Sequence, residues 1–393
     1  MRTLFLKHLA PTSEMPLMIE IERAEGIYLI QKNGEKIIDM ISGIAVSSLG
    51  HLNPAIKKAV HDQVDAYWHT MVYGEFVLSP QVKLASLISD HLPGNLDSVY
   101  FTNSGSEATE GAMKLAKRAT GRAEIISASN AYHGSTQGAA SLMWPTTFTQ
   151  AFHPLLPGTS HIQYNNFEDL EKISRQTAAV IIEAVQGEAG VVAPVEGYLE
   201  AVREKCTETG TLLIIDEAQT GFGRTGKTFA IEHSGIQPDM VLLAKALGGG
   251  FPLGAFVASK DLMKHLAFDP PLGHITTFGG HPVCTAAGLA AFEYLLENRV
   301  VEQVDAKATL IKKHIQHPAI RSIRNVGLMF ALEIGSFEKV FKVVKAGLEQ
   351  GILVDWFLFN SDCIRLAPPL IISEEEIKLA CEKLKTAMDV LLD

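Results

Sequence analysis

The sequence of 393 residues has little cysteine and no excess of positive charge. Its four cysteines lie far apart and form no Cys-x-x-Cys pair, which excludes a disulfide-stapled scaffold and the common zinc-finger spacings and favours a reducing compartment. The 34 Lys and Arg residues are outnumbered by 44 Asp and Glu residues, so the formal net charge is −10. Nucleic acids and anionic membranes are bound by clustered Lys and Arg side chains. Neither is therefore expected as a partner.

A secretory signal is also missing, because the apolar run at the N-terminus is too short and no small-residue cleavage site follows it. Residues 241–258 carry only one charge and are long enough to count as a membrane-span candidate. Lys245, three successive glycines and Pro252 interrupt this stretch, which predicts a buried strand followed by a loop. We expect a cytoplasmic protein that does not cross a membrane.

Short, continuously apolar runs alternate with helical patterns from about residue 80 to residue 290. Such runs predict strands covered on both faces, and the helices between them predict βαβ units. The predicted strands span 98–102, 124–128, 179–182, 211–215 and 240–243, and the predicted helices span 107–119 and 198–209. This pattern indicates an α/β fold with a mostly parallel sheet flanked by helices.

From about residue 286 the pattern changes to mixed helices and strands, which predicts a smaller α+β domain. Helices are predicted over 285–297, 300–315 and 337–350, and strands over 328–334, 352–359 and 363–366. Ser373 and Glu376 have capping-box spacing and predict the start of the last helix. We therefore predict an N-terminal segment without clear periodicity (1–45) that packs with the small domain, a large domain (46–285) and a small C-terminal domain (286–393).

Two of the predicted buried strands end in opposite charges, Asp216 and Lys245. The carboxyl ends of parallel strands line the ligand crevice of an α/β sheet. A lysine at the end of an apolar strand is desolvated, which lowers its pKa and makes the amine more nucleophilic. The alternative is that Lys245 reaches solvent or pairs with a structural carboxylate.

The loop 103–107, Asn-Ser-Gly-Ser-Glu, lies between a predicted strand and a predicted helix. Its backbone N–H groups and the helix N-terminus could bind an anion, and Gly105 would let a phosphate approach closely. Ser104 and Glu107 also have capping-box spacing, so simple helix capping explains them equally well.

Residues 221–226 match the Gly-x-Gly-x-x-Gly pattern of dinucleotide-binding proteins. That fingerprint requires a strand directly before it and a helix directly after it. Here residues 217–220 intervene and the following residues do not resemble a helix start, which argues against NAD binding. His-Glu-x-x-His, EF-hand and Gly-x-Ser-x-Gly spacings are absent, so neither a metal nor a serine-hydrolase site is expected.

Together these motifs resemble the class III aminotransferases of the ornithine and acetylornithine type. The resemblance runs from residues 43–54 to residues 364–368 and is most specific in residues 215–226 and 244–250. It implies the type I fold of pyridoxal-phosphate-dependent transferases, with a large domain and a smaller α+β domain. It further implies pyridoxal 5′-phosphate as cofactor and a homodimer with shared active sites.

The resemblance also implies a role for each candidate residue. Lys245 corresponds to the lysine that forms the Schiff base and carries the proton, and Asp216 to the carboxylate that keeps the pyridine nitrogen protonated. The further cofactor contacts that it implies are Gln219 at the phenolic oxygen, Gly105 and Ser106 at the phosphate, Tyr132 stacked on the ring and Thr277 at the phosphate of the neighbouring subunit. The alternative for Tyr132 is a core aromatic, and for Thr277 a loop hydroxyl.

Two further positions bear on the substrate. Glu188 and Arg365 match a switch in which the glutamate masks the arginine for an ω-amino donor and releases it to bind the α-carboxylate of glutamate or 2-oxoglutarate. The alternative is an ordinary salt bridge. Ser135 departs from the family pattern, since ornithine-type members have an arginine there that binds the distal carboxylate of the donor. Either the donor lacks this carboxylate, or another cation such as Arg2 or Lys32 supplies the contact. Ala184, where the family has proline, is a minor departure.

The function implied is the ping-pong transfer of an ω-amino group from an ornithine- or acetylornithine-like donor to 2-oxoglutarate. The alternatives that share the cofactor are an amine:pyruvate transaminase, a 4-aminobutyrate-type transaminase, an aminomutase, a decarboxylase and a non-catalytic pyridoxal-binding protein. An NAD-dependent oxidoreductase built on residues 221–226 is the alternative from another class. An aminomutase or decarboxylase would consume amine without a keto acid.

Overall fold

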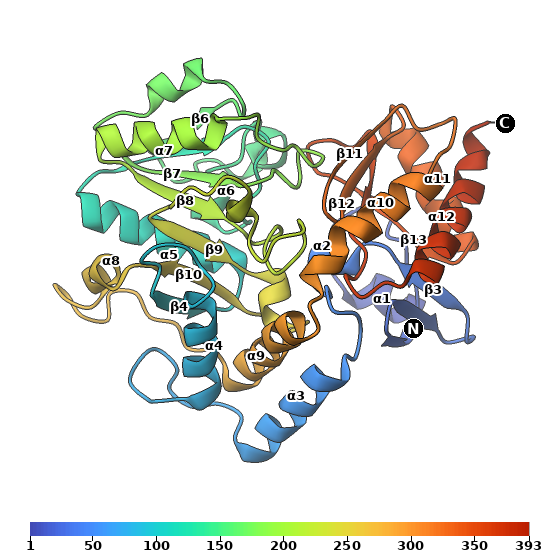
Figure 1. The fold of residues 1–393 in the computed structure, drawn as a ribbon, viewed down its shortest axis with the longest axis horizontal. Helices are drawn as coiled ribbons and strands as arrows, with labels where there is room; N and C mark the ends of the chain where they lie inside the picture. Colours follow the sequence, from blue (N-terminus) through green and yellow to red (C-terminus); the bar gives the residue numbers. More distant parts are fainter. Residues whose placement is uncertain (393) are drawn as a thin grey trace.

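The computed structural model describes residues 1–392, and its largest element is a seven-stranded sheet (Figure 1). In spatial order the strands are β4 (Ser98–Thr102), β10 (Gly254–Ala258), β9 (Met240–Leu243), β8 (Leu212–Asp216), β7 (Thr177–Glu183), β5 (Glu124–Ala128) and β6 (Thr159–Ile162). β10 is antiparallel to both of its neighbours, and all other pairs are parallel. All strands except β10 therefore end at the same edge of the sheet.

Successive residues of the central strands alternate between two apolar cores. On β8, Ile214 packs in a cluster with side chains of α5 (Gly105–Thr120), whereas Ile215 packs with side chains of α7 (Tyr198–Thr209) and α9 (Pro282–Glu297). Both faces of the sheet are thus covered by helices, which explains why the strand sequences are continuously apolar. The predicted α/β architecture of the large domain is confirmed.

The C-terminal part forms an antiparallel sheet with helices, as predicted for a smaller α+β unit. Its strand order is β11 (Ser322–Val326), β12 (Met329–Glu333), β15 (Cys363–Leu366) and β14 (Asp355–Trp356). The accompanying helices are α10 (Val304–His314), α11 (Phe337–Glu349) and α12 (Glu374–Met388). Ser373 and Glu376 form the predicted capping box at the start of α12. The run at 352–359 is two short strands rather than one, and residue 393 lies outside the described residues.

The N-terminal segment contains regular structure that its sequence pattern does not predict. After α1 (Arg2–His8), the strands β1 (Ile21–Glu25), β2 (Tyr28–Gln31) and β3 (Lys36–Asp39) form an antiparallel meander. β3 then pairs in parallel with β13 (Ile352–Leu353), more than 300 residues along the chain. Strands this short depend on a partner from elsewhere, so local periodicity cannot reveal them.

The stretch 241–258 contains two buried strands and not one. β9 ends at Leu243, a 3₁₀ turn spans Lys245–Gly248, and the fully buried β10 follows. The glycines and the proline lie in the connection between these elements. Among residues 1–392, no helix combines the length and the apolar character needed to span a membrane.

The remaining helices surround these sheets. They are α2 (Ser42–Ala45), α3 (Pro54–Ala66), α4 (Ser79–Ser89), α6 (Gln137–Ala140) and α8 (Lys260–Met263). α9 is continuous from Pro282 to Glu297, so the boundary predicted between residues 285 and 286 falls inside this helix.

A fully buried arginine, Arg224, links three parts of the chain. Its guanidinium donates hydrogen bonds to the carbonyl oxygens of Leu328 and Pro368 and to the hydroxyl of Ser48. The Leu328 N–H in turn donates to the Arg224 carbonyl oxygen. Burial lowers the pKa of Arg224 to about 9, which still leaves it charged at neutral pH. The turn that carries Arg224 is therefore fixed both to the loop at Ser48 and to the C-terminal sheet.

Candidate active site

Lys245 and Asp216 lie at the carboxyl ends of adjacent parallel strands. Asp216 is the last residue of β8 and pairs with Leu242 of β9, and Lys245 follows the end of β9 by two residues. Asp216 is buried, and it is one of the charges that act on Lys245. The structure therefore brings the two candidate residues together at the edge where a ligand crevice is expected.

The Lys245 side chain is held in an unusual way. Its backbone φ is +51°, a region that non-glycine residues seldom occupy and that often marks functional sites. Burial lowers the pKa of the Lys245 amine, against the opposing effect of Asp216, Glu188 and Glu183. No hydrogen bond or ion pair within residues 1–392 engages its ammonium. The amine is thus available to react.

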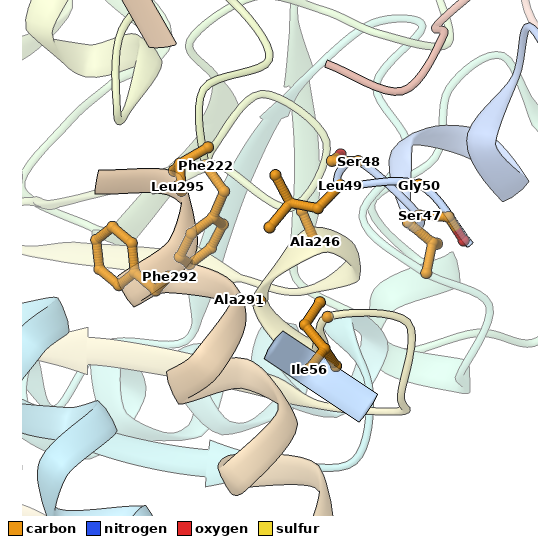
Figure 2. A pocket seen from close by; sticks show the side chains of 12 residues that line it. Ser47, Ser48, Leu49, Gly50, Ile56, Phe222, Ala246, Ala291, Phe292 and Leu295 are labelled. Carbon is orange, nitrogen blue, oxygen red and sulfur yellow. The ribbon is translucent and has the colours of Figure 1, made fainter. Parts of the chain in front are cut away.

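The turn that carries Lys245 rests on an apolar base. Ala246, the next residue, lines a small pocket together with Leu49, Phe222 and Phe292 (Figure 2). Phe222 and Phe292 pack edge to face, with ring centroids 5.2 Å apart. These side chains connect α9 and the loop at Leu49 to the lysine turn.

The Asp216 carboxylate is oriented by two donors. The Ala218 N–H donates to Oδ1 at 2.8 Å, and His133 Nδ1 lies 2.7 Å from Oδ2. Burial alone would lower the pKa of His133, but the hydrogen bond to Asp216 and the charges of Asp216 and Glu183 raise it. His133 Nε2 is buried without a partner among the described residues.

Glu183, at the end of β7, is in register with Asp216 and is also buried. Its Oε1 accepts from the Gly187 N–H at 3.0 Å, whereas Oε2 has no partner among the described residues. Burial raises the pKa of Glu183 to about 7. Two buried carboxyl groups thus lie side by side, and at neutral pH Glu183 is partly protonated.

This shift predicts a pH-dependent stability. The pKa of Glu183 is raised from 4.5 to about 7, so between these values the folded chain retains a proton that the unfolded chain releases, and stability falls as the pH rises. Glu183→Gln removes a penalty on the order of 3 kcal/mol above neutral pH. Thermal unfolding of the cofactor-free protein should show the variant gaining stability over wild type between about pH 5 and about pH 8. In the exposed control Glu338→Gln no such gain is expected; an equal gain there would contradict the assignment.

The N-terminus of α5 presents free backbone donors beside this edge. Ser104 caps the helix by accepting from the Glu107 N–H at 3.2 Å, which confirms its predicted capping role. The N–H groups of Gly105 and Ser106 pair with no other group among the described residues. A Cβ on Gly105 would lie 3.2 Å from the Ala244 side chain, which places these donors next to the lysine turn. They form an anion-binding arrangement.

The loop 132–135 lies over the same helix end. The Ser135 N–H donates to Ser106 Oγ at 3.2 Å, and a Cβ on Gly134 would collide with Ser106. Tyr132 is half-buried and its hydroxyl lies 2.7 Å from the hydroxyl of Ser135. The close approach at Gly134 explains why glycine is needed there.

Glu188 and Arg365 form a buried ion pair across a long sequence separation. Glu188 also accepts from Gln219 Nε2 at 3.3 Å and from the Leu358 N–H at 3.1 Å. Although burial alone would lower it, the pKa of Arg365 is raised by the carboxylates of Asp355 and Glu188. Gln219 and Arg365 line one small pocket. The structure therefore brings Gln219, Glu188 and Arg365 together.

Thr277, by contrast, is exposed and lies apart from these contacts within one chain. Its neighbour Thr276 accepts hydrogen bonds from Asn103 Nδ2 and the Gly279 N–H. Arg2 and Lys32 line a pocket made only of residues 1–32, which contains none of the candidate cofactor-binding residues. Residues 221–226 form turns and no helix begins there, so the dinucleotide-binding requirement is not met.

Comparison with known proteins decides the family. The family model of class III aminotransferases matches residues 9–388. An acetylornithine aminotransferase from Methanopyrus kandleri is 40% identical over 97% of this chain and 96% of its own length. The chain belongs to the class III aminotransferases. It is therefore a transferase that depends on pyridoxal phosphate, with the type I fold.

Solved structures of aminotransferases agree with this family. An ornithine aminotransferase from Toxoplasma gondii superposes with a TM-score of 0.91 at 27% identity and covers 100% of this chain and 94% of its own. An (S)-enantioselective omega-transaminase from Thermomicrobium roseum superposes with a TM-score of 0.92 at 30% identity, over 100% and 98% of the two chains.

The residues of this aminotransferase fit the cofactor. Free N–H groups at the start of α5 suit a phosphate, the unpaired Lys245 amine suits an aldehyde, and the buried Asp216 carboxylate suits a protonated ring nitrogen. His133, Glu183 and Asp355 are site residues that the sequence patterns did not single out. Glu183 carries the signal that identified Asp216, an acidic residue at the end of a buried strand. His133 and Asp355 carry no comparable signal.

Proposed function

We propose that this aminotransferase moves an ω-amino group from an ornithine- or acetylornithine-like donor to 2-oxoglutarate. The observation that carries the proposal is the buried Arg365–Glu188 pair next to Gln219. An arginine masked by a movable glutamate lets one site accept a side-chain amine first and an α-carboxylate afterwards. The M. kandleri relative, an acetylornithine aminotransferase, supports this substrate class.

The roles proposed for the site residues follow from their positions. When bound, pyridoxal phosphate supplies an electron-poor ring that takes up the electrons released at the substrate carbon. Lys245 would hold the cofactor covalently through Nζ and would move the proton at the amine-bearing carbon. Asp216, oriented by His133, would keep the ring nitrogen protonated. The remaining contacts proposed are Gly105 and Ser106 with the phosphate, Tyr132 with the ring face and Gln219 with the phenolic oxygen.

The transfer proceeds in two half-reactions, with the first product leaving before the keto acid binds. In the first half-reaction Glu188 occupies Nη1 of Arg365, so this arginine is not open to the carboxylate end of the donor. In the second, Glu188 moves away and Arg365 binds the α-carboxylate of 2-oxoglutarate. This order explains why both residues are buried and in contact.

The donor itself is less tightly defined by the site. Ser135 offers a hydroxyl already engaged with Tyr132, and a hydroxyl cannot bind a carboxylate as a guanidinium does. This favours a second candidate function, an amine transaminase that uses pyruvate, and the similar T. roseum omega-transaminase supports it.

We propose in addition a cytoplasmic homodimer. The four cysteines of the chain are unpaired, as is usual in a reducing compartment.

The dimer interface is proposed near Thr277. This exposed residue is followed by Phe278, which is exposed to 55% although its ring centroid lies 4.8 Å from that of His69. Trp68 is 69% exposed. Exposed aromatic side chains on adjoining loops are typical of an interface, and Thr277 would there reach the phosphate of the neighbouring subunit.

A half-reaction screen tests the function. The holoenzyme is mixed with ornithine, acetylornithine, 4-aminobutyrate, lysine or diamines without a keto acid, and conversion to the aminated cofactor is followed by absorbance. We expect ornithine or acetylornithine to convert it, and 2-oxoglutarate to reverse the change. Reversal by pyruvate but not by 2-oxoglutarate would establish the second candidate. Amine consumption without any cofactor conversion would contradict both.

A further inference from the structure

Arg365 contacts a second carboxylate besides Glu188. Its Nε and Nη2 donate to the two oxygens of Asp355 at 2.8 and 2.9 Å, which makes a bidentate pair. Nη2 also donates to the carbonyl oxygen of Trp356 at 2.7 Å, and Nη1 donates to Glu188. Of the N–H donors of a guanidinium, only one on Nη1 is left without a partner.

Asp355 is fixed more firmly than Glu188. It belongs to β14 and lies directly opposite Arg365 of β15 in the antiparallel register, so the backbone holds the two side chains together. Glu188 has a longer side chain and lies in a turn, closed by the bridge between Gln186 and Val192, outside the named strands. A substrate can displace Glu188 without disturbing the sheet, whereas it cannot displace Asp355 in this way.

Phe357 restricts the guanidinium further. Its ring lies 5.0 Å from Arg365 Cζ and covers one face of the planar group. Arg365 itself is only 5% exposed, so its orientation is set by these neighbours. When Glu188 moves away, the group that remains is an arginine paired with an aspartate, with no net charge and with Nη1 alone free.

We propose that Asp355 is a specificity-determining residue that limits the binding of a keto acid to the Nη1 edge of Arg365. The proposal rests on the function proposed above. A carboxylate binds a guanidinium most tightly through two parallel hydrogen bonds from two nitrogens. Asp355 occupies the Nε–Nη2 edge and the Trp356 carbonyl oxygen takes the second Nη2 donor, so that bidentate grip is not open to the substrate. The α-carboxylate of the acceptor is therefore held weakly.

The isosteric substitution Asp355→Asn separates this role from simple support. An amide oxygen still accepts from Nε and keeps Arg365 in place, but the amide nitrogen cannot accept from Nη2. The Nη2 N–H released from Asp355 lies on the Nε edge and still faces residue 355, so the variant leaves Nη1 as the binding edge. It removes the negative charge of Asp355 and thereby restores the net positive charge of Arg365 toward a carboxylate at Nη1. If Asp355 merely positioned Arg365, the substitution would weaken the binding of a carboxylate. If Asp355 limits access to Arg365, the substitution strengthens the binding of a carboxylate.

The test uses the second half-reaction alone. Apoenzyme is loaded with pyridoxamine 5′-phosphate and mixed with increasing 2-oxoglutarate. In Asp355→Asn the half-saturating concentration is expected to fall about tenfold, because the restored positive charge of Arg365 attracts the α-carboxylate more strongly. Calorimetry of glutarate, a non-reacting dicarboxylate, on the apoenzyme should show tighter binding by the same factor. Asp355→Ala, measured in the same way, replaces Asp355→Asn if that variant does not fold.

The possible results distinguish the role proposed for Asp355 from the proposed aminotransferase function on which it rests. If the loaded wild-type enzyme fails to react with every keto acid tested, the proposed function is wrong, whatever the result for the variant. If wild type reacts and Asp355→Asn shows an unchanged or higher half-saturating concentration, the role of Asp355 is wrong and the function stands. Asp261→Asn removes the same charge from a side chain that is 90% exposed; it should behave as wild type.

Discussion

Replacing Lys245 by alanine is expected to reduce amino transfer by a factor on the order of 10⁴ or more, because one side chain supplies both the covalent attachment and the proton transfer. The amine that performs both tasks is unpaired, its pKa is lowered by burial, and its backbone is held at a φ of +51°. No other lysine is among the charges that shift the pKa of Lys245, so we expect no second primary amine to take its place. Steady-state rates measure the loss, and borohydride reduction followed by peptide mapping should label Lys245 in wild type and nothing in the variant.

Lys260→Ala is the matched control, since that side chain is 71% exposed and only loosely paired with Asp97 at 3.6 Å. It should retain wild-type activity and labelling. A small amine added to Lys245→Ala should restore part of the proton transfer, which separates the chemical role from a folding defect. A reducible covalent adduct that persists in Lys245→Ala would show that another residue holds the cofactor.

The second large effect is expected for Asp216→Asn, which should lower kcat/KM by roughly 10²–10³-fold, the cost of removing one preorganised electrostatic contact at a developing charge. An amide of the same shape still accepts from the Ala218 N–H but carries no charge to hold a proton on the ring nitrogen. The substitution also removes the charge-assisted hydrogen bond and the negative charge of Asp216, both of which raise the pKa of His133. The rate loss should therefore appear at saturating substrate as well as in kcat/KM.

The cofactor should still bind to Asp216→Asn. Its affinity in Asp216→Asn, measured by titration of the apoenzyme, should change far less than kcat, because the phosphate contacts at α5 are untouched. Asp261→Asn again provides the charge-matched surface control. Normal turnover in Asp216→Asn would mean that this carboxylate does not face the ring nitrogen.

Much of the large domain could be predicted because its signals are local. A strand buried on both faces is continuously apolar, as in β9, and α7 begins and ends at the residues that the helical pattern indicates. Lys245 and Asp216 were found for the same reason: each charge follows an apolar run, and parallel strands place their carboxyl ends together.

The features that could not be predicted depend on partners distant in sequence. β3 becomes a strand because β13 lies beside it, and β10 is flanked by glycine and proline that resemble loop residues. The pairing of Asp355 with Arg365 depends on the register of two short strands, which no local pattern encodes. The Glu188–Arg365 pair could be anticipated only through resemblance to a family.

The burial of Arg224 has a consequence for how the molecule comes apart. A cation whose contacts are two carbonyl oxygens and a hydroxyl cannot be left in an apolar interior if any one of those contacts is lost. Separating the C-terminal sheet from the turn that carries Arg224 would leave this buried charge without its hydrogen-bond partners. The turn that carries Arg224, the segment at Ser48 and the C-terminal sheet are therefore expected to come apart together rather than one at a time.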